Sequence, residues 1–411
     1  MLPAPLSARP LPRAVQAAIV AVLLLAGAMR SALAQSLPDR LADSTFWRLM
    51  TEYSEPWGTF RSENFVSNET SLQWVIPELT RTIKPGGVYL GVAPDQNFTY
   101  IVNVKPAIAF IVDIRHQNAV QHLLYKALIE MSGTRAEFLS KLFARPPSVH
   151  TDTSYSAFAL AHAFDTSRPD SALFRANLAA IKDRLMRVHR FALSDSEQVS
   201  LDCVYGAFFA YGPGLTYNHS SPCANPGPMG GGFGGGGFGG RGGGGGGGGM
   251  FGMPTFATMI EESDGAARNR SYLTTEAAFQ LLKQMEERNL IVPLTGNFAG
   301  DKALRSVGTW TRDHGATITT FYVSNVEQYL FRQDDEAERF YRNVATLPID
   351  STSTFIRSST LGGGFGGVLG GKFRQQSGRS LQMIASIRET LAAFAAGQLL
   401  TYFDALMLSH Q

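Results

Sequence analysis

The clearest chemical signal in the sequence is a group of polar residues that follows a short apolar run. Residues 87–92 read Gly-Val-Tyr-Leu-Gly-Val, and Asp95, Gln96 and Asn97 come within the next turn. In doubly wound sheets the first β-α turn approaches a ligand, because small residues let the backbone come close. We therefore expect Gly91 and the three polar side chains to bind a cofactor. The alternative is an ordinary tight turn.

A second apolar run, residues 107–113, ends in Asp113, and Arg115 follows it. Asp113 stands 22 residues after Gly91, and an acid at about that distance holds the ribose hydroxyls of an adenosine group in dinucleotide-binding folds. The Arg115 guanidinium is suited to neutralise a carboxylate or a phosphate of the same ligand. The alternatives are a solvated acid at Asp113 and a local ion pair at Arg115.

Two later groups of polar residues also come just after predicted strands. Asn297 follows one strand, where a cofactor-binding loop is expected, and its amide offers a donor and an acceptor but no acid-base function. Ser324, Asn325 and Glu327 follow another strand that contains Tyr322. We expect these four to contact the substrate, while helix capping by Ser324 or Asn325 with Glu327 in the first turn is the alternative.

The stretch before the first strand is rich in aromatic residues. Residues 36–75 hold seven tryptophan, tyrosine and phenylalanine side chains, which is too apolar for a disordered leader. Arg61 and Asn64 lie among them. We predict that this stretch caps the domain and that Arg61 and Asn64 face the substrate. A polar network satisfied under the cap is the alternative.

The elements that must position these residues alternate along the chain. Continuous apolar runs predict buried strands at residues 87–92, 107–113, 290–294 and 316–323. Amphipathic periodicity predicts helices at residues 118–131, 135–144, 155–164, 172–190, 195–210, 274–287, 301–314, 326–331, 336–343 and 381–407, the last one long and C-terminal. This alternation predicts an α/β fold, a Rossmann-like and mostly parallel sheet flanked by helices, with an aromatic-rich N-terminal cap and Gly-rich insertions.

The N-terminal end has the three parts of a secretory signal. Two arginines precede an apolar run of about 15 residues, and Ala32-Leu33-Ala34 forms a small-x-small cleavage site. We expect residues 1–34 to be a signal peptide cleaved after Ala34, and residues 35–411 to be a single domain, periplasmic or secreted. The run is shorter than the roughly 20 residues that span a bilayer, so an uncleaved anchor is the weaker alternative.

Charge and composition narrow the expected partners. Loss of the three signal arginines changes the formal net charge from +2 to −1, and a near-neutral surface argues against nucleic acid. No later run of apolar residues is long enough to predict a membrane span. The eight histidines have no zinc-ligand spacing, so no metal is expected. The remaining partner class is a small molecule.

The sequence has one pair of cysteines and two tracts that are dominated by glycine. Cys203 and Cys223 are the only cysteines, and in an oxidising compartment they favour a disulfide worth about 3 kcal/mol, against the alternative of two free thiols. Residues 225–254 and residues 362–371 are dominated by glycine. We expect a flexible Gly-rich insertion and a second Gly-rich loop, because glycine loses the most entropy on ordering.

On several of these residues the sequence resembles a family of bacterial proteins of unknown activity that are described as S-adenosylmethionine-dependent methyltransferase-like. The resemblance covers most of residues 46–360 outside the Gly-rich tracts. The matching stretches are residues 53–56, 61–69, 88–92, 95–100, 110–115, 296–300, 321–330 and 355–358. It implies a Rossmann-type sheet, with Gly91 at the cofactor loop and Asp113 at the ribose acid. The chain departs from the dinucleotide fingerprint at Ala93 and Pro94, because Pro94 lacks an N–H donor.

Three functions follow from this reading. The first is methyl transfer from S-adenosylmethionine, a displacement that depends on positioning more than on a dedicated base. The second is non-catalytic binding of a small molecule by an exported protein on a degenerate methyltransferase-like fold. The third is hydrolysis by Asp95, Asp113 and Glu327, for which the sequence offers no nucleophile-base pair. The first two stand nearly level, and no catalytic residue is assigned.

Overall fold

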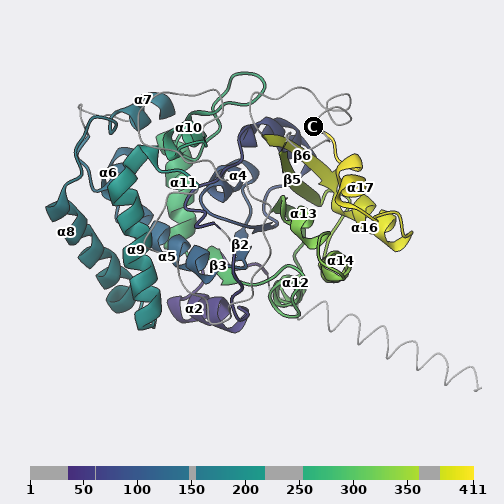
Figure 1. Ribbon diagram of the computed structural model, residues 1–411. Helices are drawn as coiled ribbons and strands as arrows, with labels where there is room; N and C mark the ends of the chain where they lie inside the picture. The colour runs from purple at the N-terminus through teal and green to yellow at the C-terminus, as the bar shows by residue number, and fades with distance from the viewer. Residues whose placement is uncertain (1–35, 61, 148–153, 218–252, 361–379) are drawn as a thin grey trace, which may run out of the picture.

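The computed structural model describes residues 36–60, 62–147, 154–217, 253–360 and 380–411. They form one six-stranded sheet with helices on both faces (Figure 1). The strands are β1 (Val88–Gly91), β2 (Ile108–Asp113), β3 (Ile291–Thr295), β4 (Ile318–Ser324), β5 (Thr354–Thr360) and β6 (Ser380–Ser386). The expected Rossmann-like, mostly parallel α/β fold is thereby confirmed.

The strand order is β3-β2-β1-β4-β5-β6. The first five strands are parallel, and β6 pairs antiparallel with β5 at the edge. Chain order reverses between β1 and β4, and in open α/β sheets ligands bind outside the carboxyl ends of the strands at such a switch point. Gly91 pairs with Ile111, two residues before Asp113, so the exits of β1 and β2 share one rim.

The helices cover both faces of the sheet. Helix α5 packs against β2 and β3, and α12 contacts β2 from the other side of these strands (Figure 1). The helices that precede the Gly-rich insertion are α2 (Asp43–Glu52), α3 (Ile76–Thr82), α4 (Gln96–Val104), α5 (His116–Glu130), α6 (Arg135–Phe143), α7 (Ala157–His162), α8 (Ser171–Lys182) and α9 (Asp195–Tyr211), with the 3-10 turns η1 (Leu72–Val75) and η3 (Gly212–Gly214) and the π-helical turn η2 (Asp183–Val188). Those that follow it are α10 (Phe256–Glu261), α11 (Glu276–Glu287), α12 (Ala303–Asp313), α13 (Val326–Leu330), α14 (Glu336–Val344), α16 (Ile387–Ala395) and α17 (Tyr402–Met407).

Most predicted elements lie where the periodicity puts them, and their ends have local causes. The Thr275 hydroxyl accepts a hydrogen bond from the N–H of Ala278 and so begins α11. Ser194 and Glu197 form a capping box that begins α9. Every residue of β1 and β2 is buried, as expected for parallel strands covered on both faces.

The predicted long C-terminal helix over residues 381–407 is wrong. Its first part is β6, which pairs with β5, a strand that the sequence reading missed. The Ser386 hydroxyl then accepts a hydrogen bond from the Glu389 N–H and begins α16. Gly397, which follows the C-cap of α16, has a left-handed φ of 68° and ends this helix. Pairing with β5 overrides the helical periodicity, because strand preference depends on neighbours more than on the segment itself.

Several predictions fall on parts of the chain outside the described residues. These are the signal peptide at residues 1–34, Arg61, Cys223 and nearly all of both Gly-rich tracts. Cys203 is disulfide-bonded, while its pairing with Cys223 stays a prediction. None of the helices in the described ranges has the length and apolar character needed to cross a bilayer.

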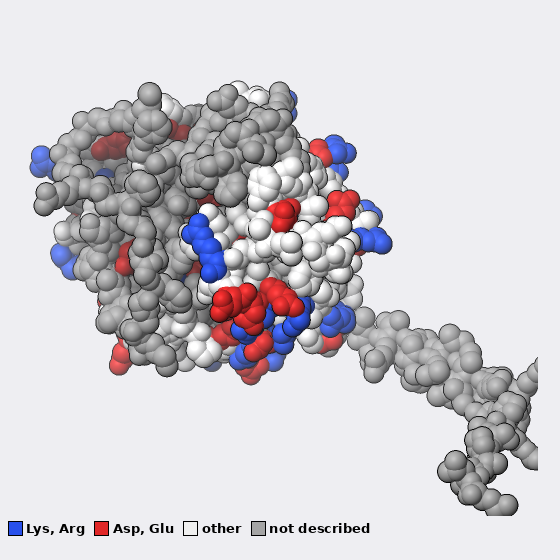
Figure 2. All heavy atoms as spheres, turned by 45° about the vertical axis from the view of Figure 1, so that its right-hand side comes forward, with Lys and Arg blue, Asp and Glu red and all other residues white. Residues whose placement is uncertain are grey.

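The surface seen in Figure 2 carries charges of both signs. Acidic and basic side chains lie next to one another in a mixed cluster on the visible face, and large white areas separate it from other charged residues. Among the described residues the helix α14 and its neighbours contain such pairs, including Arg342 with Glu338 and Arg339 with Asp301. On this face the charges are intermixed and do not form one basic field.

Candidate functional site

The carboxyl edge of the sheet is crossed by the chain that precedes β1. We call residues 53–70 the edge segment. Near β3 the Ser54 hydroxyl accepts from Thr295 N–H at 2.9 Å, and near β2 the Gly58 N–H donates to Ile114 O at 3.0 Å. A Cβ on Gly58 would lie 2.6 Å from Ile114, so glycine allows this close approach. The N-terminal cap predicted from its aromatic residues therefore lies over the carboxyl ends of β3 and β2, next to the switch point between β1 and β4.

Asp113 and Arg115 meet as an ion pair beneath the edge segment. Asp113 Oδ1 accepts from the Arg115 N–H at 2.8 Å, and its Oδ2 accepts from Arg115 Nη2 at 3.2 Å. Arg115 Nη1 donates to the carbonyl oxygen of Glu63, and Asn64 Oδ1 accepts from Arg115 Nη2 while the Asn64 amide nitrogen donates to Val66 O. Both carboxylate oxygens of Asp113, the expected ribose acid, thus have partners within the protein. Arg115 also holds the edge segment through Glu63 and Asn64.

The turn after β1 is closed by Asn97. Its amide nitrogen donates to the carbonyl oxygens of Val92, Ala93 and Pro94 at 2.8, 3.0 and 2.7 Å, and its Oδ1 accepts from the Tyr89 hydroxyl at 2.9 Å. A Cβ on Gly91 would lie 2.0 Å from that oxygen. Glycine at Gly91 therefore makes room for Asn97, and the Asn97 side chain holds the turn.

The loop after β3 binds the carboxylate of Glu55. Glu55 Oε1 accepts from the N–H groups of Lys302 and Ala303 at 2.7 and 2.6 Å, at the start of α12, and Oε2 accepts from Asn297 N–H at 3.2 Å. The Asn297 side chain donates to Glu336 at 3.1 Å and accepts from Ala299 N–H at 3.0 Å. The Glu55 carboxylate thus occupies the N-terminal end of α12, where the helix dipole and the free backbone N–H groups favour an anion.

A buried polar network joins β4 to the start of α4. The hydroxyls of Tyr322 and Ser324 both donate to the carboxylate of Glu69, at 2.7 Å from Tyr322. Gln382 Nε2 lies 3.4 Å from Glu69 Oε2, and Gln96 Nε2 donates to the Tyr322 hydroxyl at 3.1 Å. Burial raises the pKa of Glu69, and the neutral donors around it offset this only in part.

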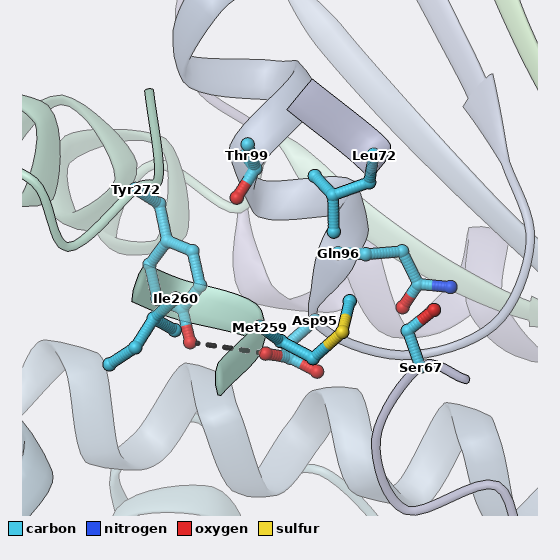
Figure 3. A pocket seen from close by; sticks show the side chains of 8 residues that line it. All are labelled: Ser67, Leu72, Asp95, Gln96, Thr99, Met259, Ile260 and Tyr272. Atoms are coloured by element: carbon cyan, nitrogen blue, oxygen red, sulfur yellow. Dashed lines mark hydrogen bonds between the residues drawn. The ribbon is translucent and has the colours of Figure 1, made fainter. Parts of the chain in front are cut away.

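Asp95 and Gln96 line a small cavity at the exit of β1 (Figure 3). The cavity has room for about one water molecule. Burial raises the pKa of Asp95 to about 7, and the Tyr272 hydroxyl lies 3.3 Å from Asp95 Oδ2. Gln96 Oε1 is buried and has no hydrogen-bond partner among the described residues. The lining residues are Ser67, Leu72, Asp95, Gln96, Thr99, Met259, Ile260 and Tyr272.

A further acid and a neutral histidine lie close to the cavity. Burial raises the pKa of Glu262, which follows α10, to about 7, although the N–H groups of Ser71 and Leu72 donate to it. On the other side His122 Nε2 lies 3.0 Å from Ala93 O. Burial lowers the pKa of His122 to about 4, so this imidazole is neutral near pH 7 and supplies no positive charge.

The two remaining residues expected at the exit of β4 have different surroundings. Asn325 is only partly buried and lies 3.4 Å from the Ser324 hydroxyl through its Oδ1. Glu327 is fully buried and pairs with Arg357, with Nε–Oε2 and Nη2–Oε1 distances of 2.6 and 2.9 Å. Glu327 also accepts from the Tyr341 hydroxyl at 2.6 Å. Its carboxylate is therefore part of the core between β4 and β5.

His116 forms a hydrogen-bonded row with Thr295 and Glu197. The Nδ1 atom lies 2.8 Å from Thr295 Oγ1 and Nε2 lies 3.0 Å from Glu197 Oε1. A hydroxyl, an imidazole and a carboxylate in such a row are the elements of nucleophilic catalysis. Thr295, however, is only 1% exposed, and the ring of Trp57 stacks on His116 at 5.4 Å. The row therefore offers no accessible nucleophile.

Only two of the residues that line the cavity were predicted from the sequence as site residues. Asp95 and Gln96 were expected at a site, whereas Thr99 was not, although it follows them at helical spacing on α4. Tyr272 and Met259 reach the cavity from segments that are distant in sequence and lack a strand-exit signal. The acid Glu69 belongs to a dense polar stretch, but nothing in its spacing indicates that β4 would enclose it.

The site residues do not fit an adenosine cofactor in this arrangement. The carboxylate of Asp113 and the amides of Asn97 and Asn297 already have internal partners, and the edge segment crosses the rim where a ribose would lie. The cavity beside Asp95 is far smaller than the roughly 300–1,000 Å³ of pockets for larger ligands. In the described ranges no three His, Cys, Asp or Glu side chains are grouped to hold a metal ion.

Comparison with known proteins gives a family match. Residues 64–201 and 255–393 match the model of a family described as "Domain of unknown function (DUF7790)". These ranges contain all six strands, the cavity and the part of the edge segment from residue 64 onward. They leave out the tract between residues 201 and 255, which holds the longer Gly-rich insertion. No curated protein matches the chain.

Proposed function

The chain belongs to the DUF7790 family, and on that premise we propose that it is an exported protein that binds a small molecule at the exit of β1, without catalysis, on a methyltransferase-like fold. The observation that carries the proposal is the cavity at the switch point, a small and only partly open space lined by Asp95 and by Gln96, whose buried Oε1 has no hydrogen-bond partner among the described residues. Exposed polar groups would be hydrated, whereas enclosed ones need a partner.

The size of the cavity limits the ligand. Room for about one water molecule admits an ion or the end group of a larger molecule. Leu72, Met259 and Ile260 form its apolar wall, so a ligand with a polar tip and a short apolar neck suits it. Ser67 of the edge segment and Met259 and Ile260 of α10 line the cavity, so a larger part of the ligand has to lie in its opening or displace one of these elements.

Methyl transfer from S-adenosylmethionine is the second candidate. The observation that favours it is the parallel order β3-β2-β1-β4, which brings the exits of Gly91 and Asp113 to one rim. Against it, the internal partners of Asp113 and Asn297 leave no acceptor free for the ribose or the adenine. The residues that would hold the cofactor are engaged in holding the edge segment, and no step of the reaction is assigned to them.

A ligand screen with cavity variants tests the proposal. Thermal unfolding of the purified chain is measured with small amines, carboxylic acids, alcohols, adenosine and S-adenosylmethionine, because a ligand that binds only the folded state raises the midpoint. We expect a small molecule to stabilise wild type and Thr99→Ser, which keeps the cavity open. The same molecule has no effect on Thr99→Ile, which fills it.

Two results would overturn the proposal. One is a stabilising ligand that acts equally on Thr99→Ser and Thr99→Ile, because it would bind elsewhere. The other is binding of S-adenosylmethionine that Asp113→Asn abolishes and Thr99→Ile does not, which would restore the cofactor site. Asp350→Asn at the opposite end of the sheet is the matched control, since among the described residues the Asp350 carboxylate accepts from its neighbours Thr352 and Ser353.

A further inference from the structure

The lining of the cavity beside Asp95 includes a hydrogen-bond acceptor, Gln96 Oε1, without a donor among the described residues. Gln96 directs its amide nitrogen to Tyr322 and leaves Oε1 on the cavity side. Figure 3 shows the Gln96 amide beside Ser67, with its oxygen on the side of Asp95 and Met259 and its nitrogen on the far side. Gln96 is only 5% exposed, and its Oε1 has no partner in the described part of the chain.

The direction of the hydrogen bonds fixes the orientation of the Gln96 amide. Tyr322 has one hydroxyl proton, which goes to Glu69 Oε2 at 2.7 Å. Its oxygen must therefore accept from Gln96, and only the amide nitrogen can donate there. The acceptor on the cavity side thus follows from the hydrogen bond that Tyr322 donates to Glu69.

The acids around the cavity have no positively charged partner. Asp95 and Glu69 are 5% exposed, and the groups that hydrogen-bond to them within the described ranges are neutral. None of the eight lining residues is Lys, Arg or His, and the nearby His122 is neutral. A buried carboxylate without a counter-charge either takes up a proton or attracts a cation.

From this geometry we infer that the cavity binds an ammonium group, as ammonium itself or as the head of a primary amine. The inference rests on the proposed function, because it names the ligand class of the same cavity. An ammonium nitrogen supplies several N–H donors and no acceptor, and it is close to water in size. Asp95, Gln96 Oε1 and the hydroxyls of Ser67 and Thr99 are the groups that would receive these donors.

A metal cation fits the cavity less well. Calcium takes six to eight oxygen ligands and magnesium requires near-octahedral coordination, whereas the cavity offers one carboxyl, one amide oxygen and two hydroxyls besides Tyr272. The apolar wall of Leu72, Met259 and Ile260 suits the methylene next to a primary amine. Potassium has the charge and a similar size but makes no directed hydrogen bonds, so it serves as the discriminating probe.

Thermal unfolding and calorimetric titration of the purified chain test the inference at constant ionic strength. The probes are the chlorides of ammonium, methylammonium, potassium and tetramethylammonium, at a pH of about 8 where Asp95 is largely ionised. We expect ammonium and methylammonium to raise the unfolding midpoint, and tetramethylammonium, which has no N–H, to leave it unchanged. Asp95→Asn should weaken ammonium binding by about tenfold or more, and Asp350→Asn should not.

The outcomes separate the inference from the proposed function. Equal responses to potassium and ammonium, or none to either, overturn the ammonium assignment. If a carboxylic acid or alcohol binds and Thr99→Ile blocks it, the ammonium assignment is wrong and the proposed function stands. If no probe of any class binds, both are wrong. Should Asp95→Asn fail to fold, Gln96→Leu removes the amide acceptor instead and should weaken ammonium binding in the same assay.

Discussion

Two regions of the sheet bury acidic side chains in opposite ways. Between β4 and β5, Glu327 is fully enclosed but meets the guanidinium of Arg357 through two hydrogen bonds. Around the exit of β1, Asp95 and Glu69 are almost as deeply buried but accept hydrogen bonds only from neutral groups among the described residues. In the first region Arg357 neutralises the buried negative charge. In the second region no positively charged side chain of the described residues hydrogen-bonds to Asp95 or Glu69.

This difference distinguishes Glu327, whose carboxylate has a structural role, from Asp95, whose carboxylate lies at the candidate binding site. Desolvation disfavours the charged form of any buried acid, and a fixed cation restores it. Arg357 supplies that cation to Glu327, so the pair belongs to the core. Within the described ranges no cationic side chain hydrogen-bonds to Asp95 or lines its cavity, and a buried acid without a counter-charge beside a cavity is a candidate for binding. The predicted substrate role of Glu327 thus has a structural alternative, whereas Asp95 keeps its place at the site.

The largest expected effect comes from breaking the compensated pair. Arg357→Met leaves Glu327 buried and unpaired, which costs about 3–5 kcal/mol in free energy of unfolding. Urea unfolding near neutral pH measures the loss. The matched control is Arg342→Met, because Arg342 pairs with Glu338 on the surface and exposed pairs contribute about 0.5 kcal/mol. Equal losses in the two variants would show that the buried pair is not compensated as described.

The uncompensated region is expected to respond to pH with a defined sign. Burial raises the pKa of Asp95 from 3.8 to about 7, so the folded state binds its proton more tightly than the unfolded state does. The stability from this proton is fully present below pH 3.8 and is lost as the pH rises to about 7. Asp95→Asn removes this dependence and should be more stable than wild type at about pH 8, by ~2–4 kcal/mol.

The control for the pH experiment has the opposite sign. Hydrogen bonds from Thr352 and Ser353 lower the pKa of Asp350 against the raising effect of its partial burial. Its contribution is present above pH 3.8, the ordinary pKa of the group, and is lost as the pH falls through the lowered pKa. Asp350→Asn should therefore destabilise at neutral pH and have no effect in strong acid. Parallel pH curves for wild type and Asp95→Asn would contradict the assignment at the cavity.

The turn that places Asp95 is expected to be intolerant of a side chain at Gly91. In Gly91→Ala the added Cβ would lie 2.0 Å from Asn97 Oδ1, so Asn97 has to release part of its hydrogen-bond set. We expect a loss of about 1–3 kcal/mol in urea unfolding. Gly206→Ala is the matched control, since nothing lies within 4 Å of its Cβ position in α9. A loss no larger than in Gly206→Ala would mean that the turn is not held by Asn97.

Much of the fold follows from local patterns in the sequence. Continuous apolar runs predicted four of the strands, and amphipathic periodicity predicted helices such as α11. The last two strands were missed because β5 contains Arg357, a charged residue whose burial depends on Glu327 from another element. The alternation in β6 was hidden within a sequence that also reads as a helix, and only the pairing with β5 decides between them.

The candidate site could be predicted only where strand exits mark it. Asp95, Gln96 and Asp113 follow β1 and β2, and the shared rim of parallel strands brings them to one edge. Their partners could not be predicted, because Glu69 and Tyr272 arrive from connections that carry no periodic signal. The edge segment shows most clearly what the sequence does not predict. Its polar residues suggested contacts with a substrate, whereas Asn64 is hydrogen-bonded to Arg115 within the protein.

A third kind of compensation, weaker than the ion pair, holds the edge segment at α12. The carboxylate of Glu55 accepts from three backbone N–H groups, those of Asn297, Lys302 and Ala303, and the helix dipole favours its charge. Glu55→Gln keeps the size but removes the charge and one acceptor. We expect a loss of about 1 kcal/mol, seen as about fivefold faster amide exchange at Lys302 and Ala303.

Glu52→Gln is the matched control for this smallest effect. Glu52 is an exposed acid that lies 3.6 Å from Arg48 on α2, so its replacement should leave exchange at α12 unchanged. If the edge segment can leave the rim to admit a ligand, Glu55→Gln should also make residues 53–60 more sensitive to limited proteolysis. Unchanged exchange and unchanged cleavage would show that hydrogen bonds other than those of Glu55 hold the segment, such as those of Ser54, Gly58 and the network around Glu69.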